Sequence, residues 1–507
     1  MSWANSRGAP KQLPYDHNAL RSARVDVRAR IAWLLRISRM ASPVGGTGAD
    51  FCRRLGVIGI KMDQAGLTRR EVGDAEVTAE LISGYETLLF LPDGHLLGVC
   101  DALSRTLDSR RIRPTRIVAR ENLRAELDDV STRVRDGSAR GADWLRMAQL
   151  ITQPGGVVLP TYLQDEWTYE LVDQMSRSVG GAYVARVEAL SRLMREQHTM
   201  ASIVRVVTEQ IAEPGAQATA DAVSVWGDGI DPASLEAAVR VLLTTEDGPR
   251  IGAGHALLQR VINATMDRHG VETVFAALRT LAHQDPEYGG EVAFRVARRA
   301  SPLLAREIAQ IVGKDPLGPR PGSHIEEPAE LRTYLAAATE ESDLDGDQML
   351  ERLLREALSE DFEERRHHAH LVLMVSPYRR VLAATALRIA ATTSSATARD
   401  AAGHMLSYLA GEEQRSGLLA LLARPEQQLR SVALLGLAHG PGLPPEVDLR
   451  ELMRTPGLAP TALYAAGISG HPDLMDVRTH GPATVRASVD WWVRRGPGIR
   501  EPSRLPA

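Results

Sequence analysis

Four side chains in the run EERRHHAH have the spacing of a metal site on one helix. Glu363 and His367 lie four residues apart, and His367 and His370 lie three apart, so that one helical face would present them together with the adjacent His368. A zinc-like site needs further ligands from another element, and no second motif supplies them. We therefore expect solvated or capping histidines and no metal.

Two other patterns come close to ion or phosphate sites. The segment Asp343–Glu351 is rich in carboxylates, but Gly346 is at the fourth position, where a calcium loop has its glycine at the sixth. We expect instead an acidic N-cap for a helix that begins near Asp347. The pair Gly313–Lys314 has Ile308 where a phosphate loop requires glycine. With no acid, base or nucleophile constellation elsewhere, we expect no enzyme, no catalytic residue and no cofactor.

The composition favours helices in a reducing compartment. Apolar residues make up 44% of the 507 residues, but aromatic residues only 4%, and that balance suits stacked helices better than β-sheets. The two cysteines, Cys52 and Cys100, exclude a disulfide framework. The first residues lack the apolar core of a signal peptide, and no run approaches the roughly 18 apolar residues of a membrane span. We expect an all-α, cytoplasmic protein without membrane contact.

The N-terminal part predicts three helices after a polar tail. Residues 1–24 are expected to be disordered. Residues 25–40 have a helical apolar stripe, and the glycine-rich residues 42–48 end it. A second helix is expected from about residue 49, with Phe51 and Leu55 facing inward. A third begins after Asp63, a favoured N-cap residue.

Two runs in this region resemble a known DNA-binding family. They are LTRREVG, from Leu67 to Gly73, and LISGYETLLFLPDGHLLGVCDAL, from Leu81 to Leu103. The first is similar to the pattern Ile-Ser-Arg-Trp-Glu-x-Gly of the XRE (Cro and lambda-repressor-like) helix-turn-helix family. The second is similar to its Tyr-Glu-x-Leu-Leu-x-Leu-Pro stretch, through Tyr85, Leu88, Leu89, Leu91 and Pro92. The resemblance covers about residues 25–108 and is to the actinobacterial type with a helical C-terminal region.

The resemblance implies a role for each matched position. The expected DNA-binding residues are Lys61, Gln64, Ala65, Thr68, Arg69 and Arg70. Gln64 would contact adenine with two hydrogen bonds, which discriminate by about 1–3 kcal/mol. Thr68 would donate to a phosphate and Arg69 would contact phosphate or guanine, while Glu71 would anchor the helix internally and Gly73 would end it in a left-handed conformation.

Charge is distributed unevenly along the chain. The first 72 residues contain 13 Arg or Lys and 5 Asp or Glu, a net charge of +8, and the rest of the chain carries −12. A basic N-terminal region suits phosphate contacts, because neutralised phosphates release counterions. A solvated basic face is the alternative interpretation.

The remaining chain predicts stacked helices. We expect a connector with one helix over residues 109–160, a first helical lobe over 161–312, a linker over 313–330, a second lobe over 331–496 and a tail over 497–507. In the second lobe an Arg-x-small-small phrase at Arg399 returns 31 residues later at Arg430, and again in part at Arg486. This phrase resembles HEAT-like repeats, which stack into an α-solenoid with a binding surface. A helical bundle without repeats is the alternative.

Two functional hypotheses follow from these patterns. In the first, the protein is a transcription regulator that binds double-stranded DNA, with a homodimer on paired half-sites and a protein or small-molecule effector on the repeats. In the second, it is a protein-binding helical scaffold whose helix-turn-helix is degenerate. Arg70 in place of the family's core aromatic, and a long turn between the first two helices, favour the second.

Overall fold

A computed structural model of the chain describes residues 13–20, 22, 24–107, 120–314, 330–359, 363–455, 457–480 and 483–501. Regular secondary structure in these ranges is entirely helical, which confirms the expected all-α class. No helix in them combines the length and the apolar character needed to cross a bilayer. Most of the expected linker, residues 315–329, lies outside the described ranges, as do residues 1–12 and 502–507.

The chain forms two compact units. Unit 1 combines residues 1–116, 179–185 and 326–507, and unit 2 combines residues 117–178 and 186–325. The sequence predicted a separate head over residues 25–108 and a separate lobe over 331–496, and the structure places both in unit 1. That division was therefore wrong, because helices far apart in sequence share one core.

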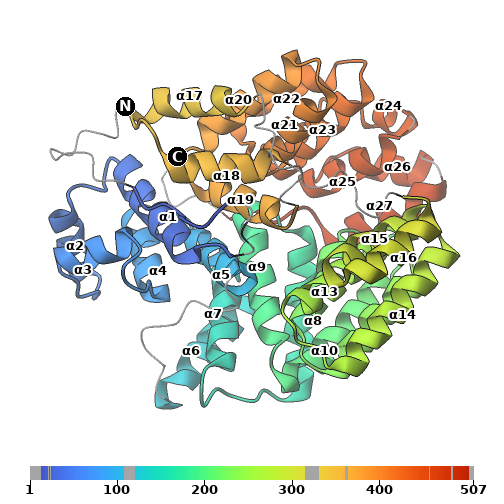
Figure 1. Cartoon of the computed structure of the whole chain (residues 1–507), viewed down its shortest axis with the longest axis horizontal. Helices are drawn as coiled ribbons and strands as arrows, with labels where there is room; N and C mark the ends of the chain where they lie inside the picture. The colour runs from blue at the N-terminus through green and yellow to red at the C-terminus, as the bar shows by residue number, and fades with distance from the viewer. Residues whose placement is uncertain are drawn as a thin grey trace. The chain divides into compact units, whose positions relative to one another are not determined.

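Five helices form the N-terminal part of unit 1 (Figure 1). They are α1 (Val27–Ala41), α2 (Gly48–Val57), α3 (Gln64–Glu71), α4 (Ala79–Leu88) and α5 (His95–Leu107). Each of the first four begins at a polar N-cap whose side chain accepts a backbone N–H, as Asp26 does from Ala29. Phe51 and Tyr85, whose rings lie 4.6 Å apart, are fully buried between these helices.

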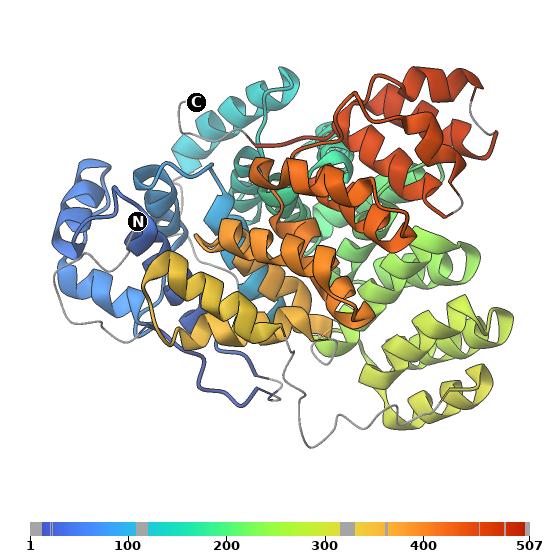
Figure 2. The ribbon, with the colours of Figure 1, turned by 90° about the horizontal axis from the view of Figure 1, so that it is seen from above.

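The C-terminal part of unit 1 is built from successive helix pairs (Figure 2, orange to red). Its helices are α17 (Leu331–Ser342), α18 (Gln348–Leu358), α19 (Glu363–Val375), α20 (Arg379–Thr392), α21 (Ala396–Leu409), η3 (Glu412–Gln414), α22 (Arg415–Leu422), α23 (Gln427–His439), α24 (Leu449–Arg454), α25 (Ala459–Ser469), α26 (Leu474–His480) and α27 (Ala483–Arg495). Helices α19, α21, α23, α25 and α27 pack one on the next. This ladder is an α-solenoid, as the repeated phrase predicted.

The repeated phrase lies at the contacts between neighbouring repeats. Arg399 on α21 donates to the side chain of Gln428 on α23 over 3.4 Å. Gly403 allows close approach of the same two helices, since a Cβ there would be 2.6 Å from a methyl group of Val432. The basic residue therefore links repeats, while the small residues bring the helix axes together.

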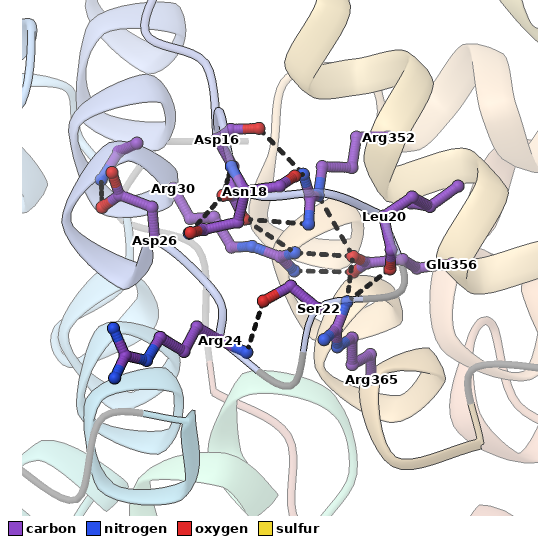
Figure 3. Close-up of polar contacts among 11 residues, drawn as sticks. Asp16, Asn18, Leu20, Ser22, Arg24, Asp26, Arg30, Arg352, Glu356 and Arg365 are labelled. Atoms are coloured by element: carbon purple, nitrogen blue, oxygen red, sulfur yellow. Dashed lines mark hydrogen bonds and ion pairs between the residues drawn. The ribbon is translucent and has the colours of Figure 1, made fainter.

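A buried ionic cluster joins α1 to α18 and α19 inside unit 1 (Figure 3). Arg30 makes two hydrogen bonds of 2.7 Å to Glu356, and both side chains are fully buried. Asp16 is also fully buried and lies 3.5 Å from Arg30 and 3.3 Å from Arg352. Arg352 donates to the backbone oxygens of Asp16 and Asn18. Residues 1–24 were expected to be disordered, and for residues 13–20 that was wrong, because these contacts fix the backbone.

Unit 2 is a second series of packed helices, drawn from cyan to yellow-green in Figure 1. Its helices are α6 (Arg120–Arg135), α7 (Gly141–Thr152), α8 (Thr161–Arg177), α10 (Gln197–Ile211), α11 (Thr219–Ser224), η1 (Val225–Asp228), α12 (Pro232–Thr244), α13 (Asp247–Ile262), α14 (Arg268–Gln284), α15 (Tyr288–Ala300) and α16 (Pro302–Val312), while α9 (Gly180–Leu193) has its first residues in unit 1. Helix α12 packs on α14, α13 on α15 and α14 on α16.

The described part of the expected connector, residues 120–160, belongs to this unit. It contains two helices, α6 and α7, where one was predicted. Trp144 on α7 is fully buried, and its indole N–H donates to Gln174 over 2.9 Å. The charged composition of α6 suggested a linker, but its apolar residues Leu123 and Val130 pack inward, so the segment contributes to the core.

Candidate nucleic-acid interface

Helix α3 has the cap and the exposure that the sequence predicted. The Asp63 side chain accepts the Gly66 N–H over 2.7 Å and fixes the start of the helix. Gln64 and Ala65, in the first turn, are exposed, as is Arg69 one turn later. Leu67, between them, is 1% exposed and faces the core. The helix therefore presents one polar face outward and is held by the opposite face.

The predicted DNA-contact residues differ in exposure and in whether their side chains hydrogen-bond within the protein. Lys61, Gln64, Ala65 and Arg69 are exposed, and they lie on one short segment. Thr68 is half-buried, and its hydroxyl donates to the Gln64 carbonyl over 2.9 Å, so donation to a phosphate would replace that bond. Arg70 is half-buried and donates to the Gly66 carbonyl over 3.1 Å.

A buried network holds α3 from behind. Glu71 accepts two hydrogen bonds from Arg39 on α1, at 2.6 and 2.7 Å, and a third of 2.6 Å from the Tyr85 hydroxyl on α4. Burial disfavours the charge on Arg39, but the hydrogen bonds and charge of Glu71 outweigh burial and raise the pKa of the guanidinium. Burial and the Glu71 charge raise the pKa of Tyr85 well above its usual value, so it remains a donor. The internal anchor expected of Glu71 is confirmed.

Two glycines are required by the backbone here, one for a left-handed conformation after α3 and one for close packing against α4. Gly73 has a φ of +89° directly after α3, which confirms the left-handed ending. The following N–H, of Asp74, then donates to the Arg69 carbonyl over 2.8 Å. Gly84 lets the segment between α2 and α3 cross α4, because a Cβ there would be 2.6 Å from the Ile60 side chain.

The surface charge of this region is smaller than the sequence count suggested. Arg30 is neutralised by Glu356, which lies outside the first 72 residues, whereas the pairing of Arg39 with Glu71 is already included in that count. Arg54 donates to the backbone oxygens of Val44 and Leu88. A formal net charge of +8 over residues 1–72 is therefore not all available to phosphates, because several arginines hold the fold together.

The segment between α2 and α3 departs from a short helix-turn-helix turn. It runs over residues 58–63, longer than the usual three or four residues. Val57 is 84% exposed and Ile58 39% exposed.

The histidine run is not solvated, and that expectation was wrong for two of its members. His368 and His370 on α19 are 6% and 2% exposed. The His370 ring stacks on Tyr408 of α21 with 4.7 Å between centroids, and His367 lies 2.9 Å from the Tyr408 hydroxyl. Burial lowers the pKa of His370 well below its usual value. No group of three or more His, Cys, Asp or Glu among the described residues is arranged to hold a metal.

The carboxylates near residue 347 have the structural role predicted for them. Asp347 caps α18 by accepting the Leu350 N–H over 3.0 Å. Its two oxygens also accept the indole N–H of Trp33 on α1, each at 3.0 Å. Gly313, with a φ of +67°, ends α16. The Gly313–Lys314 pair therefore marks a helix terminus and not a phosphate loop.

Sequence reasoning did not find the partners of these anchors. Glu71 was expected in an internal ion pair, but Arg39 lies 32 positions away and no local spacing marks it. Trp33 and Asp347 are 314 positions apart. The available signal was an arginine at positions 30 and 39 within an otherwise apolar helical stripe.

Comparisons with known proteins identify no relative. No family model and no curated protein matches the chain. Among solved structures, the chain is similar to an engineered protein at 14% identity, covering 73% of this chain and 98% of that one with a TM-score of 0.21. It is also similar to a structure of microtubule polymerases with tumor overexpressed gene (TOG) domain arrays, at 12% identity, covering 74% and 91% with a TM-score of 0.22. At these TM-scores neither likeness bears on function.

Proposed function

We propose that the protein is a cytoplasmic DNA-binding transcription regulator of the XRE type that inserts α3 into the major groove of double-stranded DNA. The observation that carries the proposal is the exposure of Gln64, Ala65 and Arg69 on a short helix whose last turn is anchored by Glu71. A recognition helix needs this combination, because base edges are read only by side chains held at a fixed position and free of internal partners.

The anchor gives the helix its rigidity. Glu71 contacts α1 through Arg39 and α4 through Tyr85, so rotation of α3 would break charged hydrogen bonds worth about 1.5–3 kcal/mol each. Gln64, Ala65 and Arg69 are exposed, and Ala65 and Arg69 differ by four positions, which places these two on one side of the helix. We propose that two chains bind paired half-sites, as helix-turn-helix dimers do, and that the repeats carry the effector surface.

Selection from DNA tests the proposal. The purified full chain is incubated with fragmented DNA of its own genome, bound fragments are sequenced, and the enriched duplex is titrated at several salt concentrations. We expect a selected sequence, and an affinity that falls linearly in log–log form with salt. Replacing Gln64→Ala and Arg69→Ala together should lower the affinity for that sequence by roughly ten-fold or more while sparing nonspecific binding.

The matched control is Arg388→Ala, an exposed arginine on α20 in the same unit. It removes the same charge from a helix outside the candidate interface and should leave both affinity and sequence preference unchanged. Equal behaviour of the α3 double variant and this control would remove α3 as the recognition helix. Absence of any selected fragment would reject DNA recognition by the chain.

A protein-binding scaffold is the second candidate. The exposed Val57 and Ile58, together with the six-residue turn 58–63, favour it, because apolar side chains beside α3 suit a protein surface better than a phosphate backbone. In that case Val57→Ser should weaken partner binding and leave DNA binding absent in both forms.

A further inference from the structure

Unit 1 contains a pocket of about 260 Å³ where α5 meets the helical repeats. His95 lines it at the start of α5, and Gly181 does so at the start of α9. The repeats contribute Arg379 at the start of α20, His439 at the end of α23, and Arg500 from the segment after α27. A volume of this size is below the roughly 300–1,000 Å³ of pockets for drug-sized molecules, so a smaller ligand fits it.

Two arginines supply positive charge and hydrogen-bond donors to the pocket. Arg379 donates to the Leu409 carbonyl over 3.0 Å, and Arg500 donates to the Ala438 carbonyl over 2.6 Å. Each guanidinium has five N–H donors, and these bonds use only one from each. Arg379 also lies 3.9 Å from Glu413, beyond hydrogen-bond distance. Burial lowers the pKa of both arginines.

The other polar groups of the pocket leave room for an anion. His439 lies 2.9 Å from the Ser407 carbonyl and 2.9 Å from the Tyr464 hydroxyl, so both of its ring nitrogens are engaged. Burial lowers the pKa of His95 to about 4, so its ring is neutral at pH 7, and among the described residues nothing hydrogen-bonds that ring. Asp93 and Glu501 also line the pocket and already have partners within the protein. Arg379 and Arg500 therefore keep N–H donors that their bonds to carbonyl groups do not use.

We propose that this pocket binds a small anion carrying a phosphate or carboxylate group, held by the guanidinium groups of Arg379 and Arg500 with the His95 ring as a further hydrogen-bond partner. Paired charged hydrogen bonds of this kind are the usual way in which arginine recognises both groups. The pocket wall includes α5 as well as the repeats, so a bound anion would contact both parts of unit 1. A role as effector of DNA binding rests on the proposed function, but the binding itself does not.

Calorimetry tests the proposal without DNA. The full chain is titrated with inorganic phosphate and, separately, with succinate, at an ionic strength held constant with sodium chloride. We expect one bound anion per chain, and the tighter of the two probes identifies the preferred group. Arg500→Met should weaken binding by roughly ten-fold or more, as expected for loss of a charged hydrogen bond.

A control variant and a second pocket variant test whether the anion binds inside the pocket. Arg380→Met removes an arginine next to Arg379 that is 75% exposed and paired with Glu413, so it should change affinity by less than two-fold. Gly181→Leu keeps both arginines and fills the pocket, since its nearest neighbour across the space is the His95 ring at 3.4 Å from a Cβ; it should abolish binding even if Arg500→Met fails to fold. No binding above the chloride background, or equal binding by wild type and Gly181→Leu, would overturn the proposal.

Discussion

Neutralising Glu356 should destabilise unit 1 more than removing the arginine that binds it. The cluster around Glu356 holds three cations, Arg30, Arg352 and Arg365, and two anions, Glu356 and Asp16. The Glu356→Gln variant keeps the shape but leaves three arginines facing one carboxylate. The Arg30→Met variant leaves two arginines facing two carboxylates.

The magnitude follows from the burial of the pair. Arg30 and Glu356 are fully buried, and the structure shows two hydrogen bonds of 2.7 Å between them. Breaking a buried pair by removing one partner costs about 3–5 kcal/mol, because the remaining charge is left without compensation. We assign this full cost to Glu356→Gln. Arg30→Met should cost less, since the charges that remain are balanced.

Hydrogen–deuterium exchange measures the effect where it occurs. Peptides from α1 and α18 should exchange roughly two to four orders of magnitude faster in Glu356→Gln, the factor that about 3–5 kcal/mol predicts when exchange follows the opening equilibrium. Peptides from unit 2 serve as an internal reference. The matched control is Glu351→Gln on the same helix, where the carboxylate is 38% exposed and pairs with Arg355. It should cost less than about 1 kcal/mol.

Two results would contradict this account of the buried cluster. Equal exchange in Glu356→Gln and Glu351→Gln would show that the buried cluster does not join α1 to α18. A larger loss for Arg30→Met than for Glu356→Gln would contradict the argument from charge balance. The double variant Arg30→Met with Glu356→Leu should recover part of the loss, because it leaves no half of the pair buried alone.

Three further predictions follow from other contacts. Tyr85→Phe removes the hydroxyl that donates to Glu71 and should lower the free energy of unfolding, measured in urea, by about 1–2 kcal/mol. The control Tyr464→Phe removes a hydroxyl from the repeats and should leave the hydrogen exchange of α3 peptides unchanged. Gly467→Ala should lower the melting temperature, because the added Cβ would lie 2.2 Å from the Trp492 ring. Gly56→Ala, whose Cβ would have no packing neighbour within 4 Å, should have a melting temperature equal to or above that of wild type. Equal melting temperatures of the two variants would contradict this. The free energy of unfolding should fall as pH drops below about 6.5. Burial lowers the pKa of His370 and His439 in the folded chain, and that of His95 to about 4, so the unfolded chain takes up protons that the folded chain does not. A melting temperature that stays constant from pH 7.5 to 5 would refute this prediction.

Local sequence determined the helices and their ends. Asp63 and Asp347 cap α3 and α18, because a short carboxylate side chain reaches the unpaired N–H groups of the helical turn that follows it. Gly73 ends α3 because the left-handed conformation there suits a residue without a Cβ. The repeated phrase at Arg399 and Arg430 likewise predicted stacked helices, since small residues at helical spacing permit close packing.

The tertiary structure alone decided how these elements combine. Arg30, Asp16 and Glu356 meet across more than 300 positions of sequence, and a charge in a helical stripe does not reveal whether it faces solvent or a distant carboxylate. The disorder expected for residues 13–20 and the separate head were for this reason predicted wrongly. The same holds for the candidate sites. Exposure of Gln64 and Arg69 was predictable from their helix, whereas the pocket between His95 and Arg500 exists only because long-range packing brings α5 and the segment after α27 together.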